Sequence, residues 1–391
     1  MKDDRPVLGT PQESDPASTA PARNAPGPAS SGDVPPRFRA ALLIPGFAGL
    51  LVGMGAGLAR LAWTVPANVA SDAALHGPLM LCGFFGVVIA LERAVAIGRA
   101  WAYAAPLAAG AGTIAAVAGE ARAAGWLFVA GSVVLVIASA DIVRRQKALF
   151  TVTIALGAAC WTVGNALWAV AGSPAEAVPW WFAFLVLTIA GERLELSRFL
   201  MPSALAKGVF AAIVAVIGAG LALAARPWGM QVCAAGLVAL AAWLAKQDIA
   251  RRTVTKQGLT RFIAVCLLAG YAWLAVAGSV MLASGGLSAG TPSYDAALHA
   301  LGLGFVFSMV FGHAPIIAPA VLRVRMPYHP AFYLPLALLH LSLLVRVAGD
   351  ARGSVAWVRV GGLLNGLALA AFIVSMVIAA VRAERPTTRA V

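Results

Sequence analysis

Two histidines in identical five-residue words are the residues of this sequence best suited to bind a metal ion. The word DAALH occurs at 72–76 and again at 295–299, and the chain contains only five histidines. Each word places an aspartate four residues before a histidine, at the head of a long apolar run. Four residues of an α-helix rise about 6 Å along its axis. The words therefore predict that His76 and His299 lie at the same depth in two helices.

The chemistry that suits such a pair is coordination of one iron atom from both sides. Two neutral imidazoles that face each other can serve as the axial ligands of a haem. The pair is less suited to zinc, because no third or fourth ligand lies at that depth. The alternative for either histidine is a hydrogen bond to a neighbouring helix. We expect His76 and His299 to bind haem iron, and Asp72 and Asp295 to cap the starts of their helices.

The other three histidines are expected to have different surroundings. His313 follows His299 by 14 residues, about 21 Å deeper along a helix, so it cannot bind the same iron. It precedes a Pro-containing segment that is expected to end the helix. His340 falls in the middle of another apolar run, and His329 in a solvated turn. A second cofactor or a proton route through His313 and His340 is an open alternative, but packing and hydrogen bonding is the preferred interpretation.

The composition places these histidines in a membrane protein. The 391 residues are 61% hydrophobic and only 12% charged, which is typical of a polytopic membrane protein. A spanning helix needs about 20 apolar residues. The sequence offers twelve such segments, at 40–60, 74–91, 101–119, 124–140, 149–172, 178–191, 208–225, 227–245, 262–284, 296–318, 331–348 and 355–381. We expect an all-α polytopic membrane protein with about twelve transmembrane helices.

The positive charge has a topological explanation. The formal net charge is +13, but 23 of the 29 lysines and arginines fall in the N-terminal tail, the even-numbered connections and the C-terminus. This asymmetry predicts that both termini are cytoplasmic, in a bacterial inner membrane, and that the lipid bilayer rather than nucleic acid is the partner. Residues 1–36 are rich in Pro, Ser and Ala and are expected to form a disordered cytoplasmic tail. The membrane domain is then 37–384, followed by a short tail at 385–391.

Recurring patterns suggest internal repetition every four helices. The second and sixth spans end in Glu92-Arg93 and Glu192-Arg193, and the first, fifth and ninth carry ladders of small residues that allow close helix packing. These recurrences predict three pseudo-repeats of four helices. The Glu-Arg pairs, with Glu195, are interpreted as interfacial ion pairs. A proton entrance would need a polar path above them, for which only scattered residues such as Asn165, Thr153 and Ser308 are available.

The twelve spans and their histidine-bearing segments resemble a known group of membrane proteins. HGPLMLCGFFG in the second span and LHALGLGFVFSMVFGHAPIIAPAVLRVR in the tenth are similar to segments of the haem-copper oxidase subunit I superfamily and of the NnrS family, which is linked to nitric oxide stress. The resemblance implies that His76 and His299 ligate a low-spin haem b. It also implies that Arg346 or Arg352, with Arg60, holds the haem propionates, for which arginine is well suited.

The departures from that superfamily limit the expected activity. The sixth and seventh spans contain no histidine, and the tenth lacks the second of the paired histidines. The copper-site ligands are therefore missing, copper binding is unsupported, and a competent terminal oxidase is not expected. The four cysteines are scattered singly and offer neither a zinc site nor a disulfide framework.

Three functions remain open from the sequence. The first is a haem-binding membrane protein that carries electrons, with a redox partner protein, or responds to nitric oxide. The second is a twelve-helix secondary transporter, although transporters place their substrate sites near the midplane. The third is a scaffold for a respiratory complex.

Overall fold

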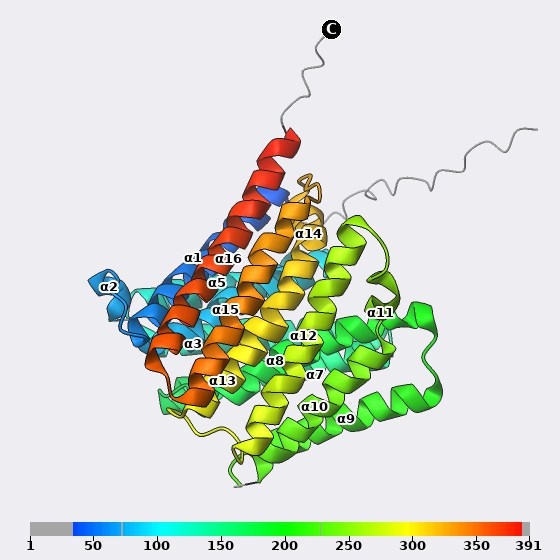
Figure 1. Ribbon diagram of the computed structural model, residues 1–391. Helices are drawn as coiled ribbons and strands as arrows, with labels where there is room; N and C mark the ends of the chain where they lie inside the picture. Colours follow the sequence, from blue (N-terminus) through cyan, green and yellow to red (C-terminus); the bar gives the residue numbers. More distant parts are fainter. Residues whose placement is uncertain (1–33, 72, 227, 385–391) are drawn as a thin grey trace, which may run out of the picture.

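The computed structural model describes residues 34–71, 73–226 and 228–384, which form a bundle of long helices (Figure 1). No β-strand occurs in these segments. The first half of the bundle consists of α1 (Pro36–Arg60), α2 (Ala67–Ala70), η1 (Ala73–Leu75), α3 (His76–Pro78), η2 (Leu79–Phe84), α4 (Phe85–Ile97), η3 (Ala100–Tyr103), α5 (Ala104–Val117), α6 (Ala121–Arg145), α7 (Leu149–Ala171), α8 (Val178–Ser197) and η4 (Arg198–Leu200).

The second half continues the same pattern of long helices and short connections. It consists of α9 (Ala204–Ala222), α10 (Gly229–Gln247), α11 (Ala250–Thr253), α12 (Gly258–Ala283), α13 (Pro292–His299), η5 (Ala300–Phe307), α14 (Ser308–Leu322), η6 (Pro330–Phe332), α15 (Tyr333–Arg352) and α16 (Val355–Glu384). The expected tails at 1–33 and 385–391 and the first aspartate, Asp72, lie outside the described residues.

The expectation of an all-α polytopic membrane protein is confirmed. Eleven helical segments of the described chain are long and apolar enough to cross a membrane. The twelfth predicted span corresponds to α8, whose last turns carry Glu192, Arg193 and Glu195. Most of α8 is buried among other helices, which explains how a less apolar helix is accommodated.

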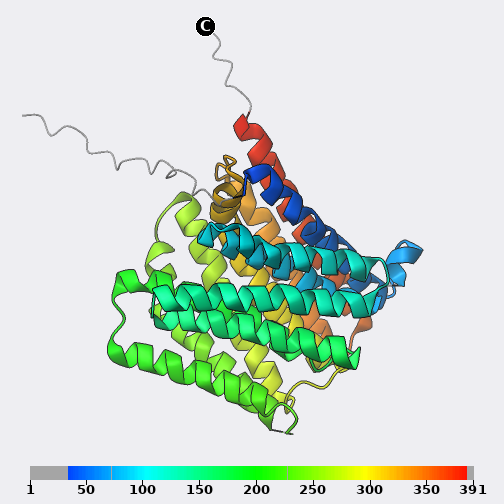
Figure 2. The ribbon, with the colours of Figure 1, turned by 180° about the vertical axis from the view of Figure 1, so that it is seen from behind.

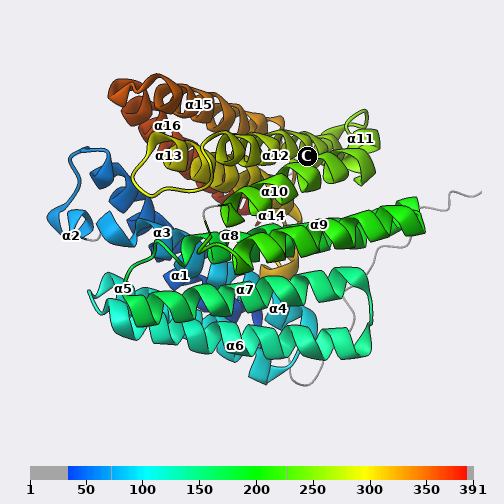
Figure 3. The ribbon, with the colours of Figure 1, turned by 90° about the horizontal axis from the view of Figure 1, so that it is seen from below.

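The second, sixth and tenth spans meet at the centre of the bundle. Helix α8 contacts both η2 and η5, and α4 contacts α14. Figure 2 shows α5, α6 and α7 as a layer on one side, and Figure 3 shows α8 and α14 between that layer and the α15–α16 pair. Each predicted group of four helices thus contributes one helix to this centre.

The two histidine-bearing spans share an unusual local structure. Each contains a π-helical segment, η2 after His76 and η5 directly after His299. Each also places a phenylalanine eight residues beyond its histidine, and the rings of Phe84 and Phe307 lie parallel with centroids 6.0 Å apart. Such π-helical segments are uncommon and often occur at functional sites.

The ends of the helices define two faces of the molecule. We call the face at which α1 begins and α4, α6, α8, α10, α14 and α16 end the basic face, since most lysines and arginines are near it. The opposite face, at which α3 and α13 begin, is called the histidine face. One boundary expectation was wrong: α14 does not end at the proline after His313 but continues through Pro315 and Pro319 to Leu322.

Candidate functional site

The rings of His76 and His299 lie next to each other near the histidine face. Their centroids are 6.2 Å apart and their planes are inclined by 15°. Two nitrogens that bind one iron atom lie about 4 Å apart, from two bonds of about 2 Å. With a ring radius of about 1.1 Å, the centroids of two such rings would lie about 6 Å apart. The observed centroid separation matches this value.

Hydrogen bonds fix the tautomer of both rings. Nδ1 of His76 lies 2.7 Å from the carbonyl oxygen of Gly53, and Nδ1 of His299 lies 2.8 Å from that of Asp295. A carbonyl oxygen can only accept, so each Nδ1 donates, and in a neutral ring Nε2 then carries the lone pair. Neither Nε2 has a hydrogen-bond partner among the described residues. A backbone bond at one ring nitrogen is the usual support of a metal-binding histidine.

Small residues of α1 position the first histidine. A Cβ atom added at Gly57 would lie 2.9 Å from two atoms of the His76 ring, and Gly53 supplies the acceptor for Nδ1 one turn earlier. The small-residue ladder of the first span therefore lets the imidazole approach the α1 backbone closely. The sequence predicted close helix packing at this ladder of small residues, but not the contact of the two glycines with His76.

A cavity of about 460 Å³ contains both histidines. It is bordered at the histidine face by Ser173–Ala175 and Ala289–Thr291, which belong to the connections before α8 and α13. Ligand sites commonly have volumes of about 300–1,000 Å³. Two of its glycines, Gly77 and Gly366, have no atom within 4 Å of an added Cβ, so the space above them belongs to the cavity. No sequence pattern indicated Gly366, which comes from the last helix.

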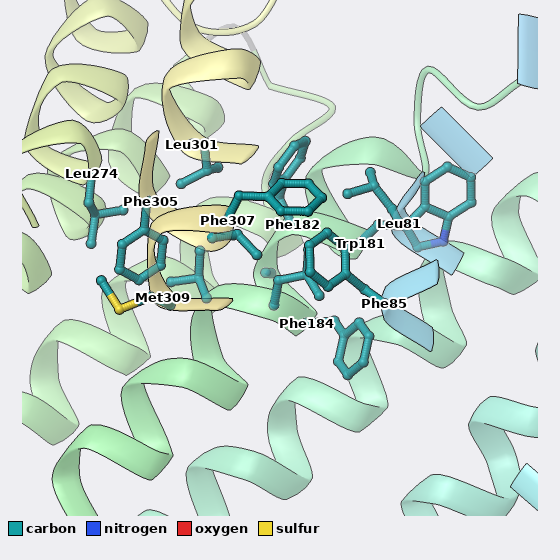
Figure 4. Close-up of a cluster of buried hydrophobic side chains, with 14 of the residues drawn as sticks. Leu81, Phe85, Trp181, Phe182, Phe184, Leu274, Leu301, Phe305, Phe307 and Met309 are labelled. Atoms are coloured by element: carbon teal, nitrogen blue, oxygen red, sulfur yellow. The ribbon is translucent and has the colours of Figure 1, made fainter. Parts of the chain in front are cut away.

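Aromatic side chains close the deep end of the cavity. Phe85, Phe182 and Phe307 line it, from the second, sixth and tenth spans (Figure 4). The rings of Phe85 and Phe307 have centroids 5.0 Å apart. The lining is mostly apolar toward this end, and the polar residues Arg60, Tyr294, Asp295 and Arg346 are nearer the entrance.

The sequence predicted that Asp295 caps the start of its helix, and this prediction was wrong. Helix α13 begins earlier, at Pro292, and its cap is Thr291, whose hydroxyl accepts a hydrogen bond from the backbone N–H of Tyr294. The Asp295 carboxylate instead accepts two hydrogen bonds from Arg346, at 2.8 Å from Nε and 2.9 Å from Nη2. It also lies 3.3 Å from Nδ1 of His299. The aspartate thus links the histidine to an arginine of α15.

The three arginines expected at the propionates occupy different positions. Arg60 and Arg346 line the cavity, and the Arg346 side chain is only 8% exposed. Asp295 uses two of the five N–H donors of Arg346, which leaves one donor on Nη2 and two on Nη1 for a further partner. Arg352 is exposed, does not line the cavity, and stacks over Trp357 at 5.1 Å from the ring centroid. The structure therefore brings two of the three arginines to the site.

The remaining histidines lie apart from this site. Both ring nitrogens of His340 contact other groups: Nδ1 accepts from the Trp273 indole at 3.1 Å, and Nε2 lies 3.5 Å from the Ser308 hydroxyl. This supports the packing interpretation of His340 over the second cofactor. His313 lies near the basic face beside Glu92, and exposed His329 accepts a hydrogen bond from the backbone of Ala331.

No group of three or more His, Cys, Asp or Glu residues suited to a metal ion occurs in the described segments. The four cysteines, all within those segments, are free. The site therefore offers two nitrogen ligands and a cavity, a donor set that suits the iron of a planar macrocycle better than a bare ion.

Comparison with known proteins identifies a family for almost the whole membrane region. No match was found among curated proteins. The family described as "Domain of unknown function (DUF8744)" matches residues 39–381. This range contains the twelve predicted spans. It also contains every residue of the histidine site. The chain belongs to the DUF8744 family.

Proposed function

We propose that this multi-span membrane protein binds one haem b between His76 and His299 and uses it to carry electrons. The observation that supports the proposal most directly is the pair of imidazoles, 6.2 Å apart, each with its Nδ1 bonded to a backbone carbonyl. A haem would supply one-electron redox chemistry at this place. The resemblance to the haem-copper oxidase superfamily and the NnrS family agrees with this assignment.

The residues around the cavity have the chemistry such a group needs. Apolar side chains and the open space above Gly77 and Gly366 would surround the macrocycle. Arg60 and the remaining donors of Arg346 would face the propionates at the entrance, where charged groups keep access to water.

Electron transfer is favoured over nitric oxide binding by the number of ligands. If His76 and His299 both held the haem, no ligand position would remain for a bound gas. The partner would then be a redox protein that docks at the histidine face. On the charge distribution we place this face outside a bacterial inner membrane, with both termini in the cytoplasm.

A secondary transporter is the other function that the cavity could serve. Transporter sites lie near the midplane and open alternately to both sides. Here the cavity lies at one end of the bundle, and phenylalanines close its deep end. The geometry therefore favours the haem site.

The test is the haem content of the full-length protein purified in detergent. We expect about one haem per chain in the wild type, and loss of at least most of it in His76→Ala and in His299→Ala. His329→Ala, which removes an exposed histidine of the other face, is the matched control and should retain the haem. Folded wild-type protein without haem, after expression with ample haem supply, would refute the proposal.

A further inference from the structure

A second group of ionisable side chains lies at the basic face, where α4, α8 and α14 come together. Nε2 of His313 is 3.5 Å from a carboxylate oxygen of Glu92, and Arg93 Nη2 is 3.5 Å from a carboxylate oxygen of Glu192. The contacts therefore join residues of the second, sixth and tenth spans. The interfacial ion pairs expected from the sequence are present: Glu92 and Glu192 have partners on other helices, whereas Glu195 pairs with Arg198 three residues later.

The group extends into the protein through Arg193. Arg193 Nε lies 3.8 Å from Asp248, whose side chain is only 1% exposed. Asp248 also accepts hydrogen bonds from the Tyr271 hydroxyl, at 2.8 Å, and from the backbone N–H of Ala250, at 2.7 Å. This end of the group is closed to water and has its hydrogen bonds satisfied.

The charges of this group balance only when one proton is added. It contains three carboxylates, Glu92, Glu192 and Asp248, but two guanidinium groups, Arg93 and Arg193. Asp248 is near Arg193 and Glu192 is near Arg93, so Glu92 is left with the His313 imidazole as its partner. An unbalanced charge between packed helices is costly.

No further ion pair to Glu92, Glu192 or Asp248 occurs among the described residues. On α1, Arg39 donates hydrogen bonds to the backbone carbonyls of Val34 and Val321. The Tyr271 hydroxyl donates to Asp248 and contributes no positive charge. One proton bound between Glu92 and His313 makes the group neutral.

This pair is the more exposed end of the group. The side chain of His313 is 36% exposed and that of Glu92 is 25% exposed, in contrast to the closed end at Asp248. We propose that Glu92, Glu192 and His313 form a proton-binding site that exchanges one proton with the aqueous phase at the basic face. The ligand is the proton itself, and the site does not depend on the haem.

The sign of the pH dependence follows from this assignment. Above about pH 7 a histidine of the unfolded chain is mostly neutral, and the glutamates are ionised. The folded site then holds one proton more than the unfolded chain. A state that binds more protons loses stability as they are removed. The folded protein should therefore become less stable as the pH rises through the release of this proton.

Potentiometric titration of the folded protein in detergent tests the proposal directly. Between about pH 6 and pH 9, the wild type should release about one proton more than Glu92→Gln, in which two carboxylates and two guanidinium groups balance without the extra proton. The matched control is Glu195→Gln, which removes a carboxylate of the exposed ion pair with Arg198. Identical titrations of Glu92→Gln and Glu195→Gln would overturn the proposal.

A second variant protects the test against a folding failure of Glu92→Gln. Glu192→Gln removes one carboxylate, so two carboxylates and two guanidinium groups balance without the extra proton. The thermal midpoint of Glu192→Gln should then fall less than that of the wild type between about pH 7 and pH 9. Glu195→Gln, on an exposed ion pair with Arg198 at the end of the same helix, should behave like the wild type. If the thermal midpoints of Glu192→Gln and the wild type changed equally with pH, the group would be an ion-pair network that exchanges no proton. The proposal would then be wrong.

Discussion

The carbonyl oxygen of Gly53 lies 2.7 Å from Nδ1 of His76, and Gly57, one turn later, leaves the space that the imidazole fills. This relationship makes α1 a support for the histidine. A side chain at either glycine would act on the ring without removing a ligand.

Gly57→Ala should weaken haem retention. The added Cβ would lie 2.9 Å from the His76 ring, closer than atoms normally approach, so the ring must move. Overpacking of this kind costs about 1–3 kcal/mol, which corresponds to an about fivefold to 150-fold loss of affinity. Haem release to an acceptor protein measures the effect. Gly208→Ala on α9, where an added Cβ meets nothing within 4 Å, is the control. Equal release rates in both variants would contradict the role of Gly57.

Gly366→Leu should exclude the haem while leaving the fold intact. Gly366 lines the cavity, and an added Cβ meets no atom within 4 Å, so a larger side chain enters open space. We expect haem content to fall severalfold and the thermal midpoint of haem-free protein to stay close to that of haem-free wild type. Gly218→Leu, at an open position of α9, should retain its haem. Full occupancy in Gly366→Leu would place the cofactor elsewhere.

Asp295→Asn should destabilise the protein through Arg346. The substitution leaves a guanidinium group that is largely buried without its charged partner. Removal of one member of such a pair costs about 3 kcal/mol. Thermal unfolding of haem-free protein in detergent measures this cost. The double variant Asp295→Asn/Arg346→Met should lose less stability than the sum of the single variants, and simple additivity would mean that the two side chains do not interact.

Asn165→Ala should be among the more destabilising substitutions outside the site. The Asn165 amide donates to the carbonyl of Phe128 at 3.1 Å and accepts from the indole of Trp181 at 2.9 Å and the thiol of Cys82 at 3.2 Å. Loss of these bonds leaves buried groups unsatisfied, at a cost of about 3 kcal/mol. Thermal unfolding checks this prediction, with Asn68→Ala on exposed α2 as the control. An unchanged midpoint would show that the bonds contribute little.

The sequence predicted the helices well because membrane insertion imposes a strong length and polarity requirement on each segment. It also predicted the pairing of His76 and His299, since a repeated word at the same distance from a helix start places its residues at equal depth. Helix ends were less accurate. α13 begins at Pro292, where Thr291 is the cap, and α14 passes through two prolines because its neighbours hold it in place.

The surroundings of the histidines could not be predicted, because they come from helices distant in sequence. Nothing near Asp295 indicated that Arg346 of α15 would bind its carboxylate, and nothing near His76 indicated that Gly366 of α16 would border the same cavity. Side-chain contacts between helices depend on rotation about the helix axes, and a uniformly apolar sequence carries little information on that rotation.

The central claim is that His76 and His299 bind the same iron, and carbon monoxide tests it most directly. The ferrous wild-type protein, with both axial positions filled, should show a low-spin spectrum that carbon monoxide does not change. His76→Gly and His299→Gly protein, reconstituted with haem, should bind carbon monoxide, and added imidazole should compete with it. Carbon monoxide binding by the wild type as readily as by the two variants would contradict coordination by both histidines.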